Sequence, residues 1–239
     1  MSDAIRVGLV GFGYASKTFH APLIGGTPGM ALKAVASSDA DKVHADWPGV
    51  KVMSAPGDLL DDPDIDLVVI ATPNDTHFPL AKAALEAGKH VVVDKPFTVT
   101  LSQARELESL AKHCGRILSV FHNRRWDSDF LTVSALINEG QLGEVCYFES
   151  HFDRFRPQVR QRWREQAGPG SGIWYDLAPH LLDQVVVLFG LPVSITVDLA
   201  QLRPGAQSTD YFHAVLAYPQ RRVVLHGTLL AAAESARFI

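Results

Sequence analysis

Short apolar runs alternate with amphipathic segments over the first half of the chain. The apolar runs predict strands at Ile5–Val10, Ala31–Ser37, Asp66–Ala71, His90–Val93 and Ile117–Phe121. Between them, apolar residues recur at helical spacing, which predicts helices at Tyr14–Ile24, Pro79–Ala87 and Leu101–His113. Strands that alternate with helices of this length form βαβ units and a parallel sheet. We therefore expect an α/β domain over residues 1–122.

The pattern changes in the second half of the chain. A helix is predicted at Ser128–Glu139, and then apolar and polar residues alternate over Glu144–Asp153, Ile195–Arg203, Tyr211–Tyr218 and Arg222–Leu229. Pro219-Gln220 predicts a hairpin turn between the last two strands. Alternation with tight turns is typical of an antiparallel sheet that carries helices on one face. Residues 123–239 are therefore expected to form a second domain of a different class.

Composition narrows the functions that these domains could have. The 239 residues carry a formal net charge of −4, which argues against a general nucleic-acid binder. No apolar stretch approaches the roughly 18 residues that a membrane span needs. The two cysteines have neither metal-type spacing nor a disulfide framework, and the N-terminus does not resemble a secretory signal. We expect a cytoplasmic protein without a structural metal.

A glycine turn joins the first predicted strand to the first predicted helix. It reads Gly11-Phe12-Gly13-Tyr14-Ala15-Ser16. Glycines let the backbone turn sharply and approach a pyrophosphate, which then lies on the helix N-terminus. Ser16 occupies the third glycine position and is small enough to keep the helix close to the strand. The alternative is a tight turn without a ligand, but the position after an N-terminal apolar strand favours dinucleotide binding.

The end of the second strand bears on the choice of cofactor. An acidic side chain at this point would bind the adenosine ribose hydroxyls of NAD. Ser37 stands there instead, followed by Ser38, and leaves room for the 2′-phosphate of NADP with Lys42 just beyond. This pattern favours NADP. In the alternative, Asp39 binds NAD.

Polar residues also follow the next two predicted strands. Thr72-Pro73-Asn74 and His77 either line the same ligand crevice or cap the helix that follows. Lys95 comes directly after the buried run Val91-Val92-Val93-Asp94, and Pro96 helps to end that strand. A lysine at the carboxyl end of a parallel strand is held by the scaffold and directed at the ligand.

The second half contains two candidate motifs. Asp176 and His180 are four residues apart after a glycine run, so they share one face if both are helical. A carboxylate beside an imidazole raises its pKa and orients it as a general base, although Asp176 could instead cap a helix and His180 could be a surface or core residue. Five arginines lie within Arg154–Arg164. One or two of them could line a substrate pocket with Trp163, or the segment could be a solvated basic loop.

These motifs, in this order, resemble the glucose–fructose oxidoreductase/inositol dehydrogenase (Gfo/Idh/MocA) family along the whole chain. The resemblance rests on the glycine turn, on Asp94-Lys95-Pro96 where the family usually has Glu-Lys-Pro, and on Asp176-x-x-x-His180. The segments Arg154–Trp163 and Pro169–Gln184 are further similar to its NADP-dependent scyllo-inositol dehydrogenase branch. The resemblance implies a Rossmann domain followed by an α/β domain whose open, mostly antiparallel sheet often mediates homo-oligomers.

The resemblance also implies reversible hydride transfer between NADP or NAD and a ring secondary alcohol of a cyclic polyol or sugar. By position, Lys95 contacts the substrate hydroxyl and the cofactor, His180 takes the hydroxyl proton, and Asp176 positions the substrate or His180. Arg125 and Trp163 join Asp176 and His180 in binding substrate. The residues implied to line the cofactor are Gly11, Phe12, Gly13, Tyr14, Ser37, Ser38, Thr72, Pro73, Asn74, His77, Asp94, Lys95 and His122.

Three expectations remain open at this point. Family members usually continue well beyond the length of this chain, so we expect it to be truncated within its second sheet. Lys95 and His180 come from different domains and are expected to face one crevice. The rival hypothesis is a non-catalytic NADP-binding sensor, because folds of this kind serve more than one function. The presence of both Lys95 and His180 favours the enzyme.

Overall fold

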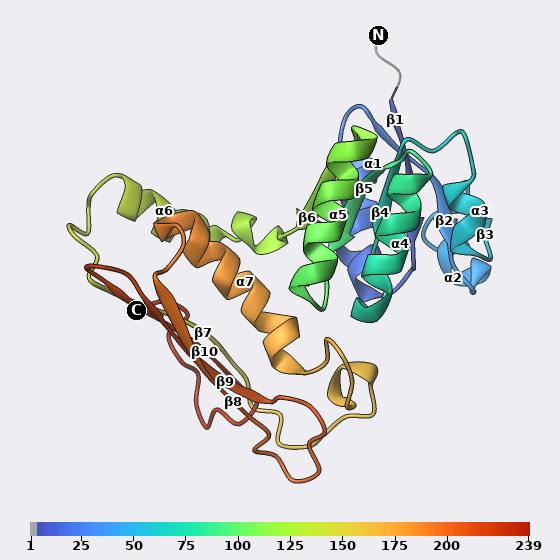
Figure 1. Ribbon diagram of the computed structural model, residues 1–239. Coiled ribbons are helices and arrows are strands. Elements are labelled where there is room, and N and C mark those ends of the chain that lie inside the picture. Colours follow the sequence, from blue (N-terminus) through green and yellow to red (C-terminus); the bar gives the residue numbers. More distant parts are fainter. Residues whose placement is uncertain (1–3) are drawn as a thin grey trace. The chain divides into compact units, whose positions relative to one another are not determined.

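Two units make up the chain, Met1–Phe121 and His122–Ile239. Both are seen in a computed structural model that describes residues 4–239 (Figure 1). The first unit contains a parallel sheet and the second a smaller mixed sheet. Within residues 4–239, no helix combines the length and the apolar character needed to cross a membrane.

The first unit is a six-stranded sheet in which every pairing is parallel. Its strands are β1 (Ile5–Val10), β2 (Met30–Ala36), β3 (Lys51–Met53), β4 (Leu67–Ile70), β5 (His90–Asp94) and β6 (Leu118–Phe121). Their spatial order is β3-β2-β1-β4-β5-β6, so the direction of winding reverses at β1. In open α/β sheets, ligands bind outside the carboxyl ends of the strands at such a reversal.

Helices cover both faces of this sheet. They are η1 (Ser16–His20), α1 (Ala21–Gly26), α2 (Ala40–His44), α3 (Pro56–Leu60), α4 (Asn74–Glu86) and α5 (Leu101–Cys114). Alternate strand residues enter two apolar clusters, one around Val7 and Leu9 and the other around Ile70 and Val93. Helices α4 and α5 lie side by side (Figure 1). Burial on both faces is what continuous apolar strands of a parallel sheet require.

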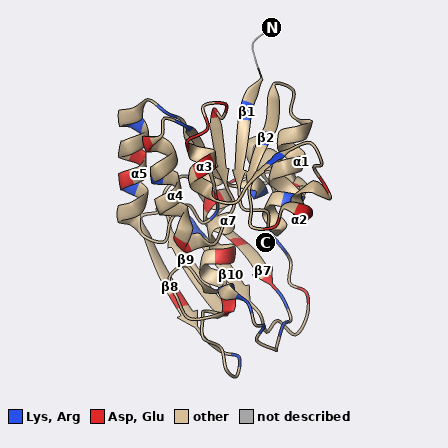
Figure 2. Ribbon diagram, turned by 90° about the vertical axis from the view of Figure 1, so that its right-hand side faces the viewer, with Lys and Arg blue, Asp and Glu red and all other residues tan. Residues whose placement is uncertain are grey.

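The predicted ends of α5 are confirmed by its caps. The Thr100 side chain accepts a hydrogen bond from the Gln103 backbone N–H, and Gly115 follows the helix with φ +62°. The outer face of α5 carries residues of both charge signs (Figure 2), including the ion pair between Lys112 and Glu108. This face is therefore a solvated one.

The structure differs from the sequence expectation at α4 and at three short elements. Helix α4 begins at Asn74 and runs through Pro79, where the sequence predicted its start. Proline is favoured at the first helical position, but in the second turn it removes only one backbone hydrogen bond, and packing against the sheet maintains the helix. Elements α2, β3 and α3 were not predicted, because segments of three to five residues are too short to show a period.

The second unit has a four-stranded sheet with the order β7-β10-β9-β8. The strands are β7 (Tyr147–Asp153), β8 (Ser194–Ala200), β9 (Tyr211–Ala217) and β10 (Arg222–Thr228). The pairs β8/β9 and β9/β10 are antiparallel, and the hairpin predicted at Pro219-Gln220 is confirmed. The pair β7/β10 is parallel, which makes the sheet mixed. Alternation predicts which face of a strand is buried, but it does not specify the direction of its neighbour.

The second unit also contains helices, of which the last, α7, packs on this sheet. They are η2 (Asn123–Trp126), α6 (Ser128–Asn138), η3 (Trp163–Glu165) and α7 (Gly172–Phe189). Leu177, Leu181 and Val185 on α7 pack with Phe212 and Leu225 of the sheet in one buried cluster. This packing fixes the α7 face that carries the candidate motif residues.

Candidate functional site

Four strands of the first unit end at residues that the sequence assigns to a cofactor site. Gly11 follows β1, Ser37 follows β2, Thr72 comes just after β4 and Lys95 follows β5. Because these strands are parallel, their carboxyl ends lie along one edge of the sheet. The structure thus brings these candidates to the same edge.

The glycine turn has the geometry of a backbone cradle. Gly11 has φ +88°, and a Cβ atom there would lie 2.9 Å from the backbone oxygen of Ala71. A Cβ at Gly13 would meet nothing within 4 Å, so this face of the turn is open. Ser16 is buried and its hydroxyl donates to the Gly11 carbonyl at 2.8 Å. Ser16 therefore closes the turn from inside, and the open backbone fits a pyrophosphate.

The two aromatic residues of the turn are placed differently from each other. Phe12 is buried in the apolar cluster that contains Val7 and Leu9, so only its backbone faces the turn. Tyr14 is 77% exposed, and its ring meets Phe19 edge-on. A direct side-chain contact with a cofactor is therefore open to Tyr14 rather than to Phe12.

At the end of β2, a serine and an aspartate have distinct roles. The Ser37 hydroxyl accepts a hydrogen bond from the Asp39 backbone N–H at 3.2 Å, and Ser37 is half-buried. The Asp39 carboxylate caps α2, because it accepts from the Lys42 backbone N–H at 3.0 Å. Ser38 lies between them, half-way through the turn. One oxygen of the Asp39 carboxylate is thus used to cap α2.

The loop after β4 is built by internal hydrogen bonds. The Thr72 hydroxyl lies 2.6 Å from that of Thr76, and Pro73 sits at the N-cap position of α4. Asn74 is buried at the first position of that helix. His77 is wholly buried, with ring nitrogens 2.8 and 3.0 Å from the carbonyl oxygens of Pro96 and Thr72. The structure therefore gives His77 contacts with two loop backbones, and its contact with a cofactor stays a prediction.

Lys95 is half-buried at the end of β5, beside an acidic neighbour. Its backbone N–H donates to the Asp94 carboxylate at 2.7 Å. The other Asp94 oxygen lies 3.7 Å from Nε2 of His20, a buried residue whose ring stacks on Phe121. Burial raises the pKa of Asp94, but the facing His20 ring and Lys95 outweigh it and hold the pKa below its usual value. The contacts of Asp94 with His20 and Lys95 thus favour its carboxylate form.

His20 was not among the site residues predicted from the sequence. It lies at the end of η1, far along the chain from Asp94, and no local motif marks it. Its only signal is that a histidine falls on the inner face of the helix after the glycine turn. The fold therefore adds a buried histidine to the residues around Lys95.

In the second unit, Asp176 and His180 both lie on α7, one turn apart, so the condition under which their spacing places them on one face is met. His180 is buried, and its ring lies edge-on to Phe152 at 6.3 Å. The helix can begin where it does because Gly172 has φ +81° and packs directly against Thr209, where a Cβ would come within 2.8 Å of the backbone. This glycine is what sets the first turn of α7 before Asp176.

The arginine segment reaches Asp176 through Arg164. Its Nε lies 3.5 Å from the Asp176 carboxylate, and its guanidinium lies over the Trp163 ring at 4.5 Å. Asp176, Arg162 and Arg164 line one small hollow at the start of α7. The Trp163 ring thus packs against the Arg164 guanidinium, which lies beside Asp176.

Arg125 and His122 converge on a different acid. Arg125 forms a bidentate pair with Asp183 of α7, at 2.7 and 2.6 Å, which raises the pKa of Arg125. His122 Nε2 lies 3.8 Å from the same carboxylate. The sequence did not select Asp183. Through it, the residues implied to bind substrate and cofactor are tied to the helix that carries His180.

One group of described side chains has the spacing of a metal site. His151, Asp153 and His226 each offer one ligand atom, and these atoms lie within 4.8 Å of one another. The Asp153 carboxylate already accepts hydrogen bonds from Ser235 and lies 2.7 Å from Nδ1 of His226. We assign the group a structural role, because it joins β7 to β10.

The parallel sheet, its reversal at β1 and the glycine turn define a dinucleotide-binding Rossmann fold. Residues 5–122 match the family model described as an oxidoreductase family with an NAD-binding Rossmann fold. Residues 134–239 match the C-terminal alpha/beta domain of the same oxidoreductase family. The chain belongs to the Gfo/Idh/MocA oxidoreductase family.

Relatives and solved structures agree with this membership. The chain is 80% identical over its whole length to YdgJ of Escherichia coli (strain K12), an uncharacterized oxidoreductase, and spans 69% of that protein. It is 37% identical over 99% of its length to IolW of Bacillus subtilis (strain 168), named scyllo-inositol 2-dehydrogenase (NADP(+)), and spans 66% of it. The solved structure of YPO2259 from Yersinia pestis is 70% identical, with a TM-score of 0.94 over 100% of this chain and 68% of that one.

Proposed function

We propose that this protein transfers a hydride between NADP and a ring secondary alcohol of a cyclic polyol or sugar, of the inositol kind. The observation that carries the proposal is the position of Lys95 at the carboxyl end of β5, on the same sheet edge as the Gly11–Gly13 turn. The name of IolW, a scyllo-inositol 2-dehydrogenase that uses NADP(+), supports this substrate class. NAD is the alternative cofactor.

Each proposed catalytic residue has a chemical role that its surroundings support. The nicotinamide, when bound, accepts or returns the hydride. The Lys95 ammonium stabilises negative charge that develops on the substrate oxygen. His180 takes the hydroxyl proton, and Asp176 one turn away orients the substrate or the ring. Burial of His180 keeps water from competing for that proton.

The preference for NADP rests on the end of β2. With Asp39 capping α2, we expect the half-buried Ser37 hydroxyl to face the adenosine ribose. A hydroxyl accommodates a 2′-phosphate, whereas a carboxylate would repel it. Ser38 and Lys42 add a hydroxyl and a positive charge nearby.

The decisive experiment follows nicotinamide absorbance with the purified protein, NADP, and a panel of inositols and aldoses. We expect Lys95→Met and His180→Asn each to lower kcat by about 100-fold or more, with the dissociation constant of NADP nearly unchanged. Lys112→Met and His113→Gln, on the exposed side of α5, serve as matched controls. Unchanged turnover in both site variants would refute the mechanism, and NADP binding without turnover of any compound would favour a sensor.

We also propose that Lys95 and His180 act on one substrate oxygen. A double variant tests this directly. If the residues act together, Lys95→Met adds little further loss to His180→Asn, because residues of one catalytic unit are strongly non-additive. Full additivity of the two losses in activation free energy would contradict a shared step.

Two further properties belong to the proposal. The free thiols of Cys114 and Cys146 support a cytoplasmic location.

Homo-oligomers would form through the sheet face opposite α7. On that face, four residues are register neighbours across the four strands: His151, His226, His213 and Asp198. We expect His213→Glu to shift the protein to smaller species in light scattering after gel filtration, since a second acid beside Asp198 adds negative charge to both copies of the proposed interface. An unchanged mass would place the interface elsewhere.

A further inference from the structure

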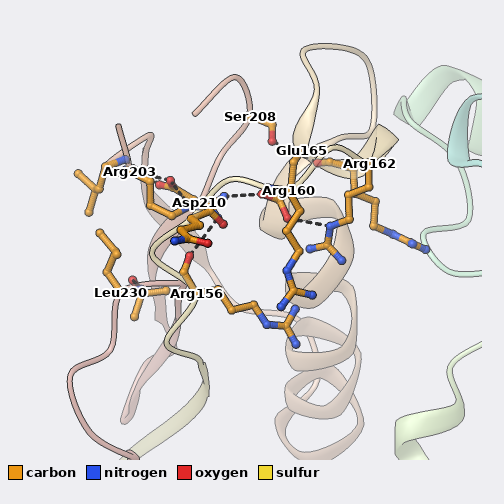
Figure 3. Close-up of polar contacts among 12 residues, drawn as sticks. Arg156, Arg160, Arg162, Glu165, Arg203, Ser208, Asp210 and Leu230 are labelled. Atoms are coloured by element: carbon orange, nitrogen blue, oxygen red, sulfur yellow. Dashed lines mark hydrogen bonds and ion pairs between the residues drawn. The ribbon is translucent and has the colours of Figure 1, made fainter. Parts of the chain in front are cut away.

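A buried ionic frame holds the arginine segment in place. Glu165 accepts hydrogen bonds from the Arg160 backbone N–H, from Arg162 Nε and from Arg203 Nη2, at 2.9, 2.7 and 3.0 Å. Arg203 also donates to the carbonyl oxygens of Arg156 and Gln158, both at 3.1 Å. These contacts, several of which are drawn in Figure 3, fix the backbone of the segment from within. The arginine side chains are therefore displayed by a rigid loop rather than by a solvated one.

The acids of the frame neutralise only part of this charge. Glu165 pairs with Arg162 and Arg203, and Arg164 lies beside Asp176. Arg154, Arg156 and Arg160 form no ion pair with any side chain in residues 4–239. In Figure 3 the guanidinium groups of Arg156 and Arg160 extend to the same side of the loop. An excess of positive charge is thus gathered on one face of a fixed segment.

Arg154 interacts electrostatically with Asp176, one of the candidate substrate residues. It is half-buried at the end of β7. Burial lowers the pKa of Arg154, and the charges of Arg156, Arg124 and Arg162 lower it further, against the opposing charge of Asp176. Arg154 therefore lies in the field of three other arginines and of one carboxylate, on the unit that carries His180. Half-buried guanidinium groups without a counter-ion are costly, and a bound anion removes that cost.

The same arginines face a hollow large enough for a small ligand. Arg154 and Arg156 line a hollow of about 520 Å³ together with Asp153, Ala231–Ala233 and Glu234. The Asp153 carboxylate is engaged by His226 and Ser235, as described above. Glu234 is exposed and adds a second carboxylate to the lining. A planar guanidinium binds a phosphate or carboxylate through two parallel hydrogen bonds, so a pair of arginines suits such a group.

We infer that the substrate of this protein carries a phosphate ester or a carboxylate, which Arg154 and Arg156 bind while the ring hydroxyl is oxidised. The inference rests on the proposed function and specifies its substrate class. Arg162 and Arg164 add positive charge beside Asp176, and the Glu165–Arg203 pair keeps the loop in the binding conformation. The polyol or sugar is therefore an acidic one.

The first experiment measures anion binding without turnover. Inorganic phosphate is titrated into the protein by calorimetry, in chloride buffer of constant ionic strength. We expect one site, weakened roughly tenfold or more by Arg154→Gln or Arg156→Gln, because each removes hydrogen bonds to a charged group. Arg105→Gln on α5 is the matched control, and Arg154→Lys and Arg156→Lys should retain part of the affinity. Absence of binding, or equal weakening by the control, would overturn the inference.

The second experiment compares substrates. A neutral polyol, its phosphate ester and the corresponding acid are supplied with NADP, so the two sources of negative charge are separated. We expect kcat/KM to be roughly tenfold or more higher for one of the charged compounds, and Arg154→Gln to remove that advantage. Equal use of neutral and charged compounds would overturn the inference and leave the proposed function intact. Phosphate binding by Arg154 and Arg156 without turnover of any polyol would refute the proposed function alone.

Discussion

Arg203 and Asp210 form an ion pair of 2.9 Å in which the side chains are 2% and 0% exposed. The same guanidinium pairs with Glu165 at 3.0 Å, so one cation serves two buried acids. Burying charges is costly unless their partners and hydrogen bonds are all in place. The conformation of the segment Arg154–Arg164 therefore depends on Arg203, which lies on another loop.

Replacing Arg203 by Met leaves Glu165 and Asp210 buried without their cation. We expect the free energy of unfolding to fall by about 3–5 kcal/mol, measured by urea denaturation. Limited trypsin digestion should also cut within residues 154–164, which the frame otherwise holds. Arg105→Met, an exposed change on α5, is the control. A loss no larger than that of the control would mean that the frame contributes little.

Gly11 and Gly13 are expected to respond differently to alanine. Gly11→Ala forces a side chain into a positive φ and against the Ala71 carbonyl, so it should destabilise the first unit by about 1–2 kcal/mol. Gly13→Ala enters open space and should leave the melting temperature unchanged. Its methyl group should nevertheless weaken NADP binding by roughly tenfold, because the pyrophosphate needs that space.

Fluorescence titration with NADPH and thermal melting check both variants side by side. Gly57→Ala, another glycine with open space around it, controls for the loss of a glycine as such. Tight NADPH binding by Gly13→Ala would show that the cofactor phosphates do not lie on this turn.

Asp153 should make the second unit sensitive to acid. Burial raises its pKa, but His226, Ser235 and His151 outweigh that and lower the pKa from 3.8 to about 2. A carboxyl whose pKa is lower in the folded state stabilises the fold above its unfolded pKa. That stability is lost as pH falls through the window from about 4 to 2, and amounts to about 2 kcal/mol.

Thermal melts of the protein and of Asp153→Asn at pH 5 and at pH 3 test this. The difference between the two proteins should be largest at the higher pH and should shrink at the lower one. Glu139→Gln, at the exposed C-cap position of α6, is the control. A difference that does not depend on pH would mean that Asp153 acts through packing alone.

Ser37→Asp should shift cofactor preference from NADP towards NAD. A carboxylate at this position repels the 2′-phosphate and accepts hydrogen bonds from the free ribose hydroxyls. We expect the ratio of NADPH to NADH affinity to fall roughly tenfold or more, as measured by fluorescence. Ser102→Asp on α5 adds the same charge at a distance. An unchanged ratio would move the site of discrimination to Ser38, Asp39 or Lys42.

Much of the fold follows from local patterns in the sequence. The apolar runs around Leu9, Ile70 and Val93 became central strands, because a parallel sheet buried on both faces tolerates little else there. The helix predicted at Leu101–His113 forms at Leu101–Cys114, as α5. Helix α2 and strand β3 were not predicted, because so few residues cannot show a hydrophobic period. Tertiary contacts determine their conformation.

The candidate site could be predicted where its chemistry is local. Asp176 and His180 share one helix face because four residues make about one turn, and the glycine turn is read from adjacent letters. The partners that fix those residues are remote. Glu165 and Arg203 are 38 positions apart, and His20 meets Asp94 across the sheet edge. Such pairs depend on the folded chain, so no spacing rule identifies them. The shared crevice of Lys95 and His180 stays a prediction.

The order β7-β10-β9-β8 has a consequence for the growing polypeptide. Strand β7 pairs on one side with Arg222–Thr228, and on the other its backbone bonds Arg237 and Ile239. Both neighbours leave the ribosome long after β7 itself, whereas the first unit completes its sheet when Leu118–Phe121 appears. During synthesis, β7 and the apolar face of α7 therefore lack their partners for a time, after the whole first unit has been synthesised. We expect this interval to be the point at which the nascent chain most needs chaperones.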